Sequence, residues 1–230
     1  MEFTDKEKSI ISQAGMGRRI GFGKRPALII IDMQIYMMGD KREPILESIK
    51  TFPSSCGEMA WDAADNIRLL IDACHSFGAP VIYTFQSIRA DGSDAGPFKM
   101  KRDLLQIDNW FIEGTHGAQI APSIKPEPQD FVFMKKRPSA FFGSPLSTYL
   151  IGQSVDTLIV TGGSTSNCVR ATVFDSASYG YRTLVASDGV CDRIETSHAI
   201  NLRDMDRQFA DVMTTQEILN GLKDIDMRSR

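Results

Sequence analysis

The 230-residue sequence has few cysteines and lacks the spacings that mark disulfide-rich or metal-binding proteins. Its four cysteines are too few for a disulfide scaffold in a chain of this size, and none of them forms a C-x-x-C pair. The three histidines show neither D-x-H nor H-x-x-x-H spacing, so we expect no metal site and no cofactor. This cysteine usage favours a reduced, cytoplasmic setting.

The sequence also lacks an excess of positive charge and a long hydrophobic run. Lysine and arginine number 26 against 29 acidic residues, a net charge of -3, which gives no basic field for nucleic acid or an anionic membrane. The longest apolar run, 26–31, has the length of a buried strand and is far too short to span a membrane. The first eight residues are polar, without the apolar core of a signal peptide. We therefore expect a soluble globular protein whose partner is a small molecule.

Short β-branched runs alternate along the chain with longer segments that have apolar residues at helical spacing, and no repeat or linker interrupts them. The runs predict strands and the longer segments predict helices. The expected strands cover 27–32, 81–84, 131–134, 156–161, 183–186 and 211–213; the expected helices cover 60–77, 145–151, 167–179, 197–209 and 215–222. Strands joined by helices run parallel, so the sequence predicts an α/β fold, a three-layer α/β/α sandwich around a mainly parallel sheet of about six strands. We expect one domain over 1–230, with an N-terminal extension over 1–24.

Three residues with chemical function follow predicted strands: Asp32, Lys136 (two residues after Met134) and Cys168. Each has an ordinary structural explanation, because Asp forms turns, a Lys in a basic run is usually solvated, and a lone Cys is often a small buried hydrophobe. Sites in open parallel sheets lie at the carboxyl ends of the strands, near the switch in strand order. The coincidence of these three residues at one edge therefore predicts a functional site there.

The segment 161–171, TGGSTSNCVRA, predicts a sharp turn of small residues between a strand and a helix that begins at or just before Cys168. A helix N-terminus favours a thiolate over a thiol, and its free N–H groups can hold a developing oxyanion. A phosphate-binding loop is the alternative interpretation. The turn matches neither G-x-x-x-x-G-K-[ST] nor G-x-G-x-x-G, so we favour the nucleophile.

The histidines offer no partner for this cysteine. His75 lies within a predicted helix, His116 in a long middle loop and His198 at the start of a late helix, so none follows a strand. A carboxylate at Asp32 is then the available proton acceptor, with Lys136 as its charge partner.

With these residues in place, the chain resembles the isochorismatase-like cysteine hydrolases, most closely the branch of N-carbamoylsarcosine and maleamate amidohydrolases. The resemblance extends from Gly21 to about Val212 and rests on spaced blocks. They are GFGKRPALIIIDMQ (21–34), KRPSAFFGSPL (136–146), TGGSTSNCVRATVFDSASYG (161–180), DGVCDR (188–193) and NLRDMD (201–206).

The resemblance implies an Asp–Lys–Cys triad of Asp32, Lys136 and Cys168. It also implies a cis peptide bond between Gly163 and Ser164, with the amides of Ser164 and Cys168 directed at the substrate's carbonyl oxygen. A Rossmann-like parallel sheet and a homotetramer with active sites near subunit contacts are further implications.

Nicotinamidases of this family bind zinc through an Asp and histidines after the second strand. This chain has TFQSIR (84–89) at that point instead, so the resemblance does not extend to nicotinamide or to a metal.

These features predict a hydrolase that cleaves a linear C–N bond of a small amide or ureide and releases ammonia through a thioester. Arg193 could bind a substrate carboxylate bidentately, or it could pair with Asp192 or Asp188. Further pocket candidates are Gln86, Arg89, Phe142 and Asn167. An uncharged ureide stays open as substrate.

Three other functions compete with amide hydrolysis. The first is vinyl ether cleavage of the isochorismatase type, and the second is a non-catalytic member that binds a metabolite. The third is a redox role of Cys168, for which Cys191 is the candidate second thiol.

Overall fold

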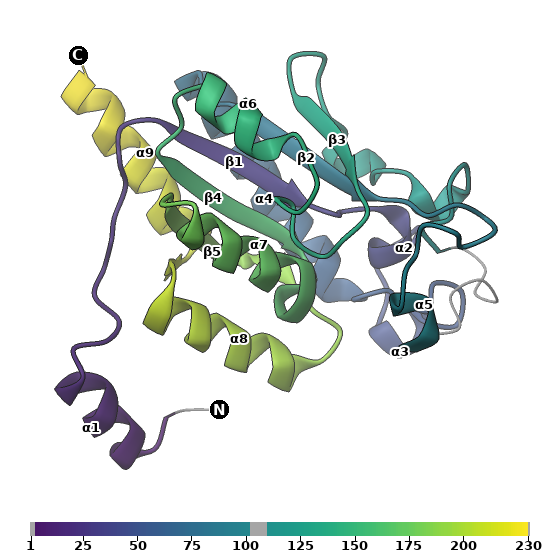
Figure 1. The fold of residues 1–230 in the computed structure, drawn as a ribbon, viewed down its shortest axis with the longest axis horizontal. Helices are drawn as coiled ribbons and strands as arrows, with labels where there is room; N and C mark the ends of the chain where they lie inside the picture. The colour runs from purple at the N-terminus through teal and green to yellow at the C-terminus, as the bar shows by residue number, and fades with distance from the viewer. Residues whose placement is uncertain (1–2, 102–109, 230) are drawn as a thin grey trace.

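The computed structural model describes residues 3–101 and 110–229, and six strands within them form one sheet (Figure 1). Their order across the sheet is β3-β2-β1-β4-β5-β6, and every adjacent pair is parallel. The strands are β1 (Pro26–Ile31), β2 (Val81–Gln86), β3 (Phe131–Lys135), β4 (Thr157–Gly163), β5 (Arg182–Cys191) and β6 (Asp211–Met213). The predicted parallel α/β fold is confirmed.

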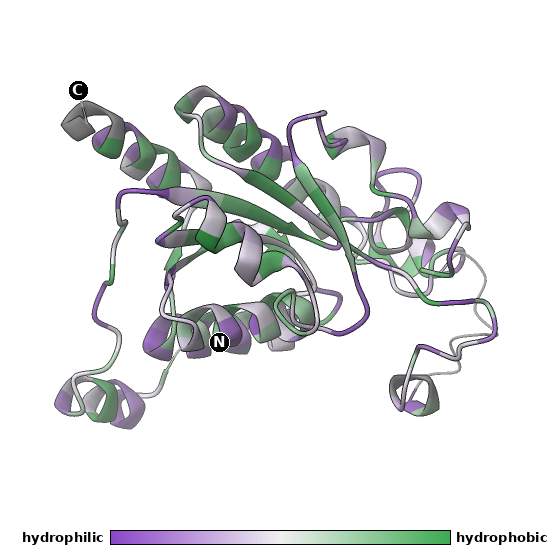
Figure 2. Ribbon diagram, turned by 45° about the horizontal axis from the view of Figure 1, so that its top comes forward, coloured by the Kyte–Doolittle hydropathy of each residue, from purple (hydrophilic) through white to green (hydrophobic). Residues whose placement is uncertain are grey.

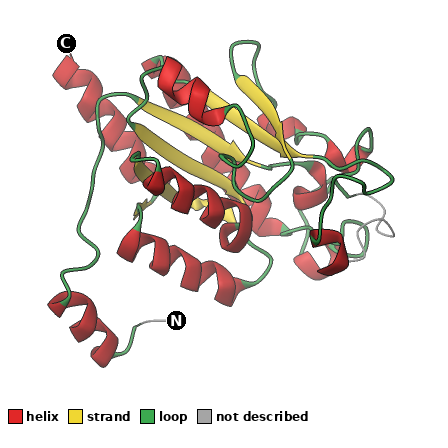
Figure 3. Ribbon diagram, viewed as in Figure 1, coloured by secondary structure: helices red, strands yellow, loops and turns green. Residues whose placement is uncertain are grey.

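Helices cover both faces of the sheet (Figure 3). The helices are α1 (Asp5–Gln13), α2 (Ile35–Met38), α3 (Ile45–Ser48), α4 (Glu58–Phe77), α5 (Phe98–Lys101), α6 (Leu146–Gly152), α7 (Arg170–Ser178), α8 (Glu195–Gln208) and α9 (Thr215–Ser229). The helices α4 and α9 share one hydrophobic cluster with the sheet, and α6, α7 and α8 share the other. The chain therefore folds as the three-layer sandwich that its alternating pattern predicts.

The central strand β1 shows why the sequence folds this way. All of its residues are apolar, and each of them is buried. Successive side chains of a strand point to opposite faces. Leu28 and Ile30 enter the cluster with α4, whereas Ile29 and Ile31 enter the cluster with α6 and α7. Each such side chain contributes about 1.5–3 kcal/mol by leaving water. The hydrophobic interior of the sheet is visible in Figure 2.

The strands β2, β3, β4 and β5 all continue past their predicted ends, and the extensions of β3 and β5 position the site. The strand β3 continues one residue further, so Lys135 is its last residue rather than the start of a loop. The strand β5 continues to Cys191, well past the predicted end at residue 186. Its pairing with β4 shifts register between Val160 and Gly162. This extension brings residues 192 and 193 to the same sheet edge as the end of β4.

The N-terminal extension contains a helix that the sequence did not predict. In α1 a capping box joins Thr4 and Glu7, but no residue of the helix is buried. The helix lies apart from the sheet, beyond α8 (Figure 1). The chain then returns to the body, where Asp211 accepts hydrogen bonds from the amides of Ile20 and Gly21. Within the part of the chain that the structure describes, no helix is both long and apolar enough to cross a membrane.

Candidate active site

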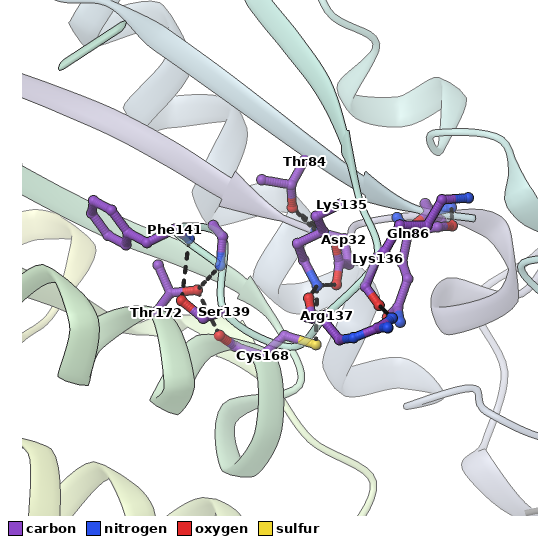
Figure 4. Close-up of polar contacts among 12 residues, drawn as sticks. Asp32, Thr84, Gln86, Lys135, Lys136, Arg137, Ser139, Phe141, Cys168 and Thr172 are labelled. Carbon is purple, nitrogen blue, oxygen red and sulfur yellow. Dashed lines mark hydrogen bonds and ion pairs between the residues drawn. The ribbon is translucent and has the colours of Figure 1, made fainter. Parts of the chain in front are cut away.

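The ends of β1, β3 and β4 bring three reactive side chains together (Figure 4). Asp32 directly follows β1, Lys135 ends β3, and Cys168 lies in a π-helical turn over 165–169 that leads from β4 into α7. The Nζ atom of Lys135 lies 2.7 Å from Oδ2 of Asp32 and 3.4 Å from Sγ of Cys168. All three side chains are buried. A cation, a carboxylate and a thiol thus form one contiguous group at the sheet edge.

The lysine of this group is Lys135, which corrects the prediction of Lys136. The Nζ atom of Lys136 lies instead 2.6 Å from Oδ2 of Asp94 and donates to the carbonyl oxygen of Ser87. Neighbouring side chains of a strand point to opposite faces. Because Lys135 ends β3 on the face toward Cys168, the next lysine points away from it (Figure 4).

The carboxylate of Asp32 is held on its other side by a threonine that the sequence analysis missed. Thr84 Oγ1 donates to Asp32 Oδ1 at 2.7 Å, and the Asp32 amide donates to the Thr84 carbonyl oxygen at 3.2 Å. Asp32 has a φ of 50°, a left-handed conformation that costs a non-glycine residue of order 1–3 kcal/mol and that concentrates at functional sites. The conformation turns the chain sharply where β1 ends.

Burial sets the protonation of the cysteine. It raises the pKa of the Cys168 thiol from 9.0 to about 12, although the nearby Lys135 ammonium opposes the shift. For Lys135, burial alone would lower the pKa, but the charges of Asp32 and Cys168 outweigh it and the pKa is raised. In the resting protein this pKa favours the thiol over the thiolate that a helix N-terminus would favour. The thiol needs a base to accept its proton, and Asp32 is in place.

The turn before the cysteine is tightly built. The peptide bond between Gly163 and Ser164 is cis, at the position that the family resemblance names. The Ser164 carbonyl oxygen accepts from the amides of Asn167 at 3.0 Å and Val169 at 3.2 Å. Thr172 Oγ1 in α7 donates to the Cys168 carbonyl oxygen at 2.7 Å. These bonds fix the backbone on both sides of the sulfur.

Arg193 lies at the same edge, next to the extended end of β5. Its Nε and Nη2 atoms donate to the Ser54 carbonyl oxygen at 3.1 and 2.6 Å. Asp192 accepts backbone amides, and Asp188 accepts the amide and hydroxyl of Thr215, so neither carboxylate is occupied by the guanidinium.

A buried tyrosine that the sequence analysis missed is influenced by the charges of this arginine and of Asp32 and Cys168. Tyr36 in α2 is buried, and burial raises the pKa of its phenol well above 10. The charges of Asp32 and Cys168 add to this rise in the pKa of the phenol, and the charge of Arg193 opposes it. The only sequence signal of Tyr36 is its position four residues after Asp32.

The four remaining pocket candidates differ in burial and in their distance from the group of Asp32, Lys135 and Cys168. Gln86 is buried at the end of β2, where its backbone pairs with the side chain of Gln34 at 2.7 and 2.9 Å. Asn167 is exposed on the same turn as Cys168. Arg89 is exposed in the following loop, and its amide donates to Asp94. Phe142 is 66% exposed and lies beside α7 rather than beside the triad. Only Gln86 and Asn167 are on segments that end at the triad.

Among residues 3–101 and 110–229, no three His, Cys, Asp or Glu side chains are grouped so that they could hold a metal ion. All four cysteines are free thiols and buried.

A family model described as an isochorismatase domain matches residues 26–217. An N-carbamoylsarcosine amidase from an Arthrobacter species is 32% identical over 221 residues, with 93% of this chain and 77% of the relative covered. A maleamate amidohydrolase from Pseudomonas putida is also 32% identical, over 218 residues, with 92% and 93% covered.

Two solved structures have a similar fold. A cysteine hydrolase from Pseudomonas syringae pv. phaseolicola has a TM-score of 0.79 at 23% identity, covering 91% of this chain and 98% of that chain, and shows the same fold. An isochorismatase family protein from Desulfovibrio vulgaris has a TM-score of 0.73 at 29% identity, with 90% and 100% covered.

Proposed function

Because this chain belongs to the isochorismatase family of hydrolases, we propose that it is a cysteine-dependent amidohydrolase that releases ammonia from a small linear amide or ureide. One observation carries the proposal: the buried ammonium of Lys135 contacts both the carboxylate of Asp32 and the sulfur of Cys168. A core that only needed stability would gain nothing from enclosing a cation, a carboxylate and a thiol. We also propose that residues 1–230 form a single isochorismatase-like domain, with residues 1–24 as its N-terminal extension.

In the first step the Cys168 sulfur attacks the amide carbonyl carbon while Asp32 accepts the thiol proton. Lys135 holds the Asp32 carboxylate in place and stabilises negative charge on the sulfur. The high pKa of the buried thiol makes this proton transfer necessary, because little thiolate is present at neutral pH.

The tetrahedral intermediate carries a negative oxygen, which we assign to the backbone amides of Ser164 and Cys168. Losing one such donor typically slows an enzyme by about 10²–10³-fold. Collapse of the intermediate expels ammonia, which takes the proton back from Asp32 and leaves a thioester on Cys168. Asp32 then accepts a proton from water, the resulting hydroxide attacks the thioester, and the sulfur leaves and recovers the proton.

We propose a substrate that bears a carboxylate. Arg193 is a partly buried cation whose planar guanidinium can bind a carboxylate through two parallel hydrogen bonds. The two relatives at 32% identity carry the names of amides of this kind. Gln86 and Asn167 are further candidates for substrate contact, and the exposed Arg89 is a candidate for the mouth of the site. Phe142 lies beside α7 and is not proposed to contact the substrate. No cofactor enters this scheme.

We also propose that the protein acts as a homotetramer in the cytoplasm. The free thiols support a reducing compartment. Exposed apolar side chains on the open edge strand β3 (Val132, Met134) and beside α7 (Phe142, Tyr179) offer surface for association.

Ammonia release from a panel of compounds tests the proposed reaction. The panel contains N-carbamoylsarcosine, maleamate, a ureidoacrylate analogue, biuret and nicotinamide, each with wild type and Cys168→Ala. We expect release from one carboxylate-bearing amide or ureide and a loss of at least about 10³-fold in the variant, because no other group can form the thioester.

The control is the unfolding temperature, which should change little because a buried Cys→Ala substitution removes only one sulfur. Substantial turnover by Cys168→Ala would rule out the mechanism. Failure of every compound with wild type would shift the assignment to vinyl ether cleavage or to a non-catalytic member of the family.

A further inference from the structure

A buried carboxylate that has no role in the chemistry above links the nucleophile to a neighbouring helix. Asp192 follows β5 and is 3% exposed. Its Oδ2 atom accepts from the Ser166 amide at 2.7 Å. Its Oδ1 atom accepts from the amides of Arg193 at 2.8 Å and Ile194 at 3.3 Å. One side chain therefore joins the turn after β4 to the segment that starts α8.

The segment held by Asp192 is the part of the chain that carries both proposed oxyanion donors. We call residues 164–168 the nucleophile turn; Ser166 is at its centre, two residues from Ser164 and two from Cys168. Hydrogen bonds from backbone amides to a carboxylate are roughly twice as strong as neutral ones. Burial of the Asp192 carboxylate adds to this, because a hydrogen bond is electrostatically stronger at a low local dielectric constant.

Thr165, the residue before Ser166 in the turn, is also bound to the end of β5 and to α8. Thr165 Oγ1 donates to the Cys191 carbonyl oxygen at 3.1 Å and lies 2.9 Å from Nδ1 of His198 in α8. The centre of the nucleophile turn is thus bound at two adjacent positions to the connection between β5 and α8. The amides of Ser164 and Cys168 cannot move independently of that connection.

We propose that Asp192 is a positioning residue of this hydrolase, which fixes the nucleophile turn so that the amides of Ser164 and Cys168 meet the oxyanion. The inference rests on the proposed function. Asp192 acts through Ser166 and does not touch the substrate. It should therefore affect the rate of the chemical step more than substrate binding, because the Arg193 guanidinium is held separately by the Ser54 carbonyl oxygen.

The substitution Asp192→Asn tests this assignment with little change of shape. An amide oxygen can still accept one set of bonds, but the amide NH₂ group then faces a backbone N–H, and two donors repel. We expect kcat to fall by about 10–100-fold, a fraction of what a lost oxyanion donor costs, and KM to change by less than about threefold. If this variant does not fold, Asp192→Ser replaces it, since its hydroxyl can accept one amide.

The matched control is Asp211→Asn. Asp211 is 2% exposed and accepts from the amides of Ile20 at 3.0 Å and Gly21 at 2.7 Å, so its burial and its partners resemble those of Asp192. It begins β6, at the end of the sheet opposite the triad. Both variants should unfold at a lower temperature, but only Asp192→Asn should lower kcat.

Alkylation of Cys168 by iodoacetamide separates loss of the oxyanion donors from damage to the nucleophile. In this reaction the sulfur displaces iodide from carbon and no oxyanion forms. The rate at Cys168, followed by mass spectrometry of its peptide, should therefore stay within about twofold of wild type in Asp192→Asn.

Two results would overturn the assignment of Asp192. One is a kcat for Asp192→Asn equal to that of Asp211→Asn, and the other is an alkylation rate that falls in parallel with kcat. Absence of ammonia release from every compound with wild type would instead refute the proposed function, and the role of Asp192 in it would fall as well.

Discussion

At the scale of single residues, two adjacent lysines have opposite environments. Lys135 is buried against Asp32 and Cys168, whereas Lys136 forms a partly exposed ion pair with Asp94. Removing one partner of a buried ion pair is costly, about 3–5 kcal/mol, because the other charge is left without compensation. A partly exposed pair contributes at most about 1 kcal/mol. Their substitution should therefore have very different effects.

The prediction is that Lys135→Met lowers kcat by at least about 10²-fold, because Asp32 loses the cation that orients it for proton transfer. The matched variant Lys136→Met should keep kcat within about threefold of wild type. Steady-state kinetics of ammonia release measures both, and thermal unfolding should show the larger loss of stability for Lys135→Met. A larger effect at Lys136 would restore it to the triad and contradict the geometry of β3.

The sequence predicted Asp32 and Cys168 at the sheet edge but assigned the wrong lysine. The cause lies in the pattern of β3, which reads Phe-Val-Phe-Met-Lys-Lys from residue 131. Apolar residues occupy both alternating sets, so the sequence does not reveal which set faces the core. The structure does: Phe133 is 7% exposed and Met134 is 41% exposed. Lys135 therefore shares the buried face.

Other residues of the site were beyond sequence reasoning for a different reason. Thr84, Tyr36 and Asp192 act through contacts with segments far away in the chain, such as the bond between Thr84 and Asp32. Nothing in the local sequence distinguishes these residues from ordinary core positions. The cysteine was recognisable because its whole turn, and not the residue alone, has an unusual composition.

At the scale of elements, the approach of β4 to β1 depends on a glycine. Gly162 has a φ of 97°, and it pairs with Ile31 across the two strands. A Cβ atom at this position would overlap the carbonyl oxygen of Ile31. Both the backbone conformation and the close contact therefore require glycine at the strand end that precedes the nucleophile turn.

The prediction is that Gly162→Ala lowers the free energy of unfolding by more than about 1–3 kcal/mol, the cost of the unfavourable φ alone. The control is Gly152→Ala in α6, where a Cβ atom would meet nothing within 4 Å and where alanine favours the helix. Urea unfolding of the two variants measures the difference. Equal stability of the two would show that the strands can separate at this point without cost.

The elements were predicted well where the apolar pattern was continuous and less well where it was interrupted. The pair Asp188-Gly189 suggests a turn, yet β5 runs through both residues and continues to Cys191. The reason is tertiary, because β4 lies alongside and pairs with Val190 and Cys191 after the register shift. Pairing with β4, a strand that is distant in the sequence, outweighed the local propensity of Asp188 and Gly189 to form a turn.

At the scale of the whole molecule, the order of the strands explains where the site forms. The chain runs outward from β1 through β2 to β3, and then returns to add β4 on the other side of β1. The order reverses between β1 and β4, and these are the strands that deliver Asp32 and Cys168. The sequence predicted a site at such a switch from general rules, but the order itself became known only from the structure.

The N-terminal helix α1 leads to a prediction about the whole molecule. Because none of its residues is buried, removing residues 1–14 sacrifices almost no apolar burial within the chain. We expect the shortened protein to keep its kcat and to unfold within about 2 °C of wild type. Light scattering after size exclusion should give the proposed tetramer for both forms. A smaller assembly in the shortened protein would show that α1 contacts a neighbouring subunit.

The alternation of side chains along β3 also has a consequence for how this family member could tolerate mutation. Because Lys135 and Lys136 are adjacent, the sequence alone suggests that one could replace the other after a mutation. The strand prevents this, because a side chain on one face of a sheet cannot reach the opposite face without a shift of the whole strand by one residue. Such a shift would expose Phe133 and bury Met134 in its place. Lys136 therefore cannot replace Lys135, and the proposed active site depends on the ammonium group of Lys135 alone.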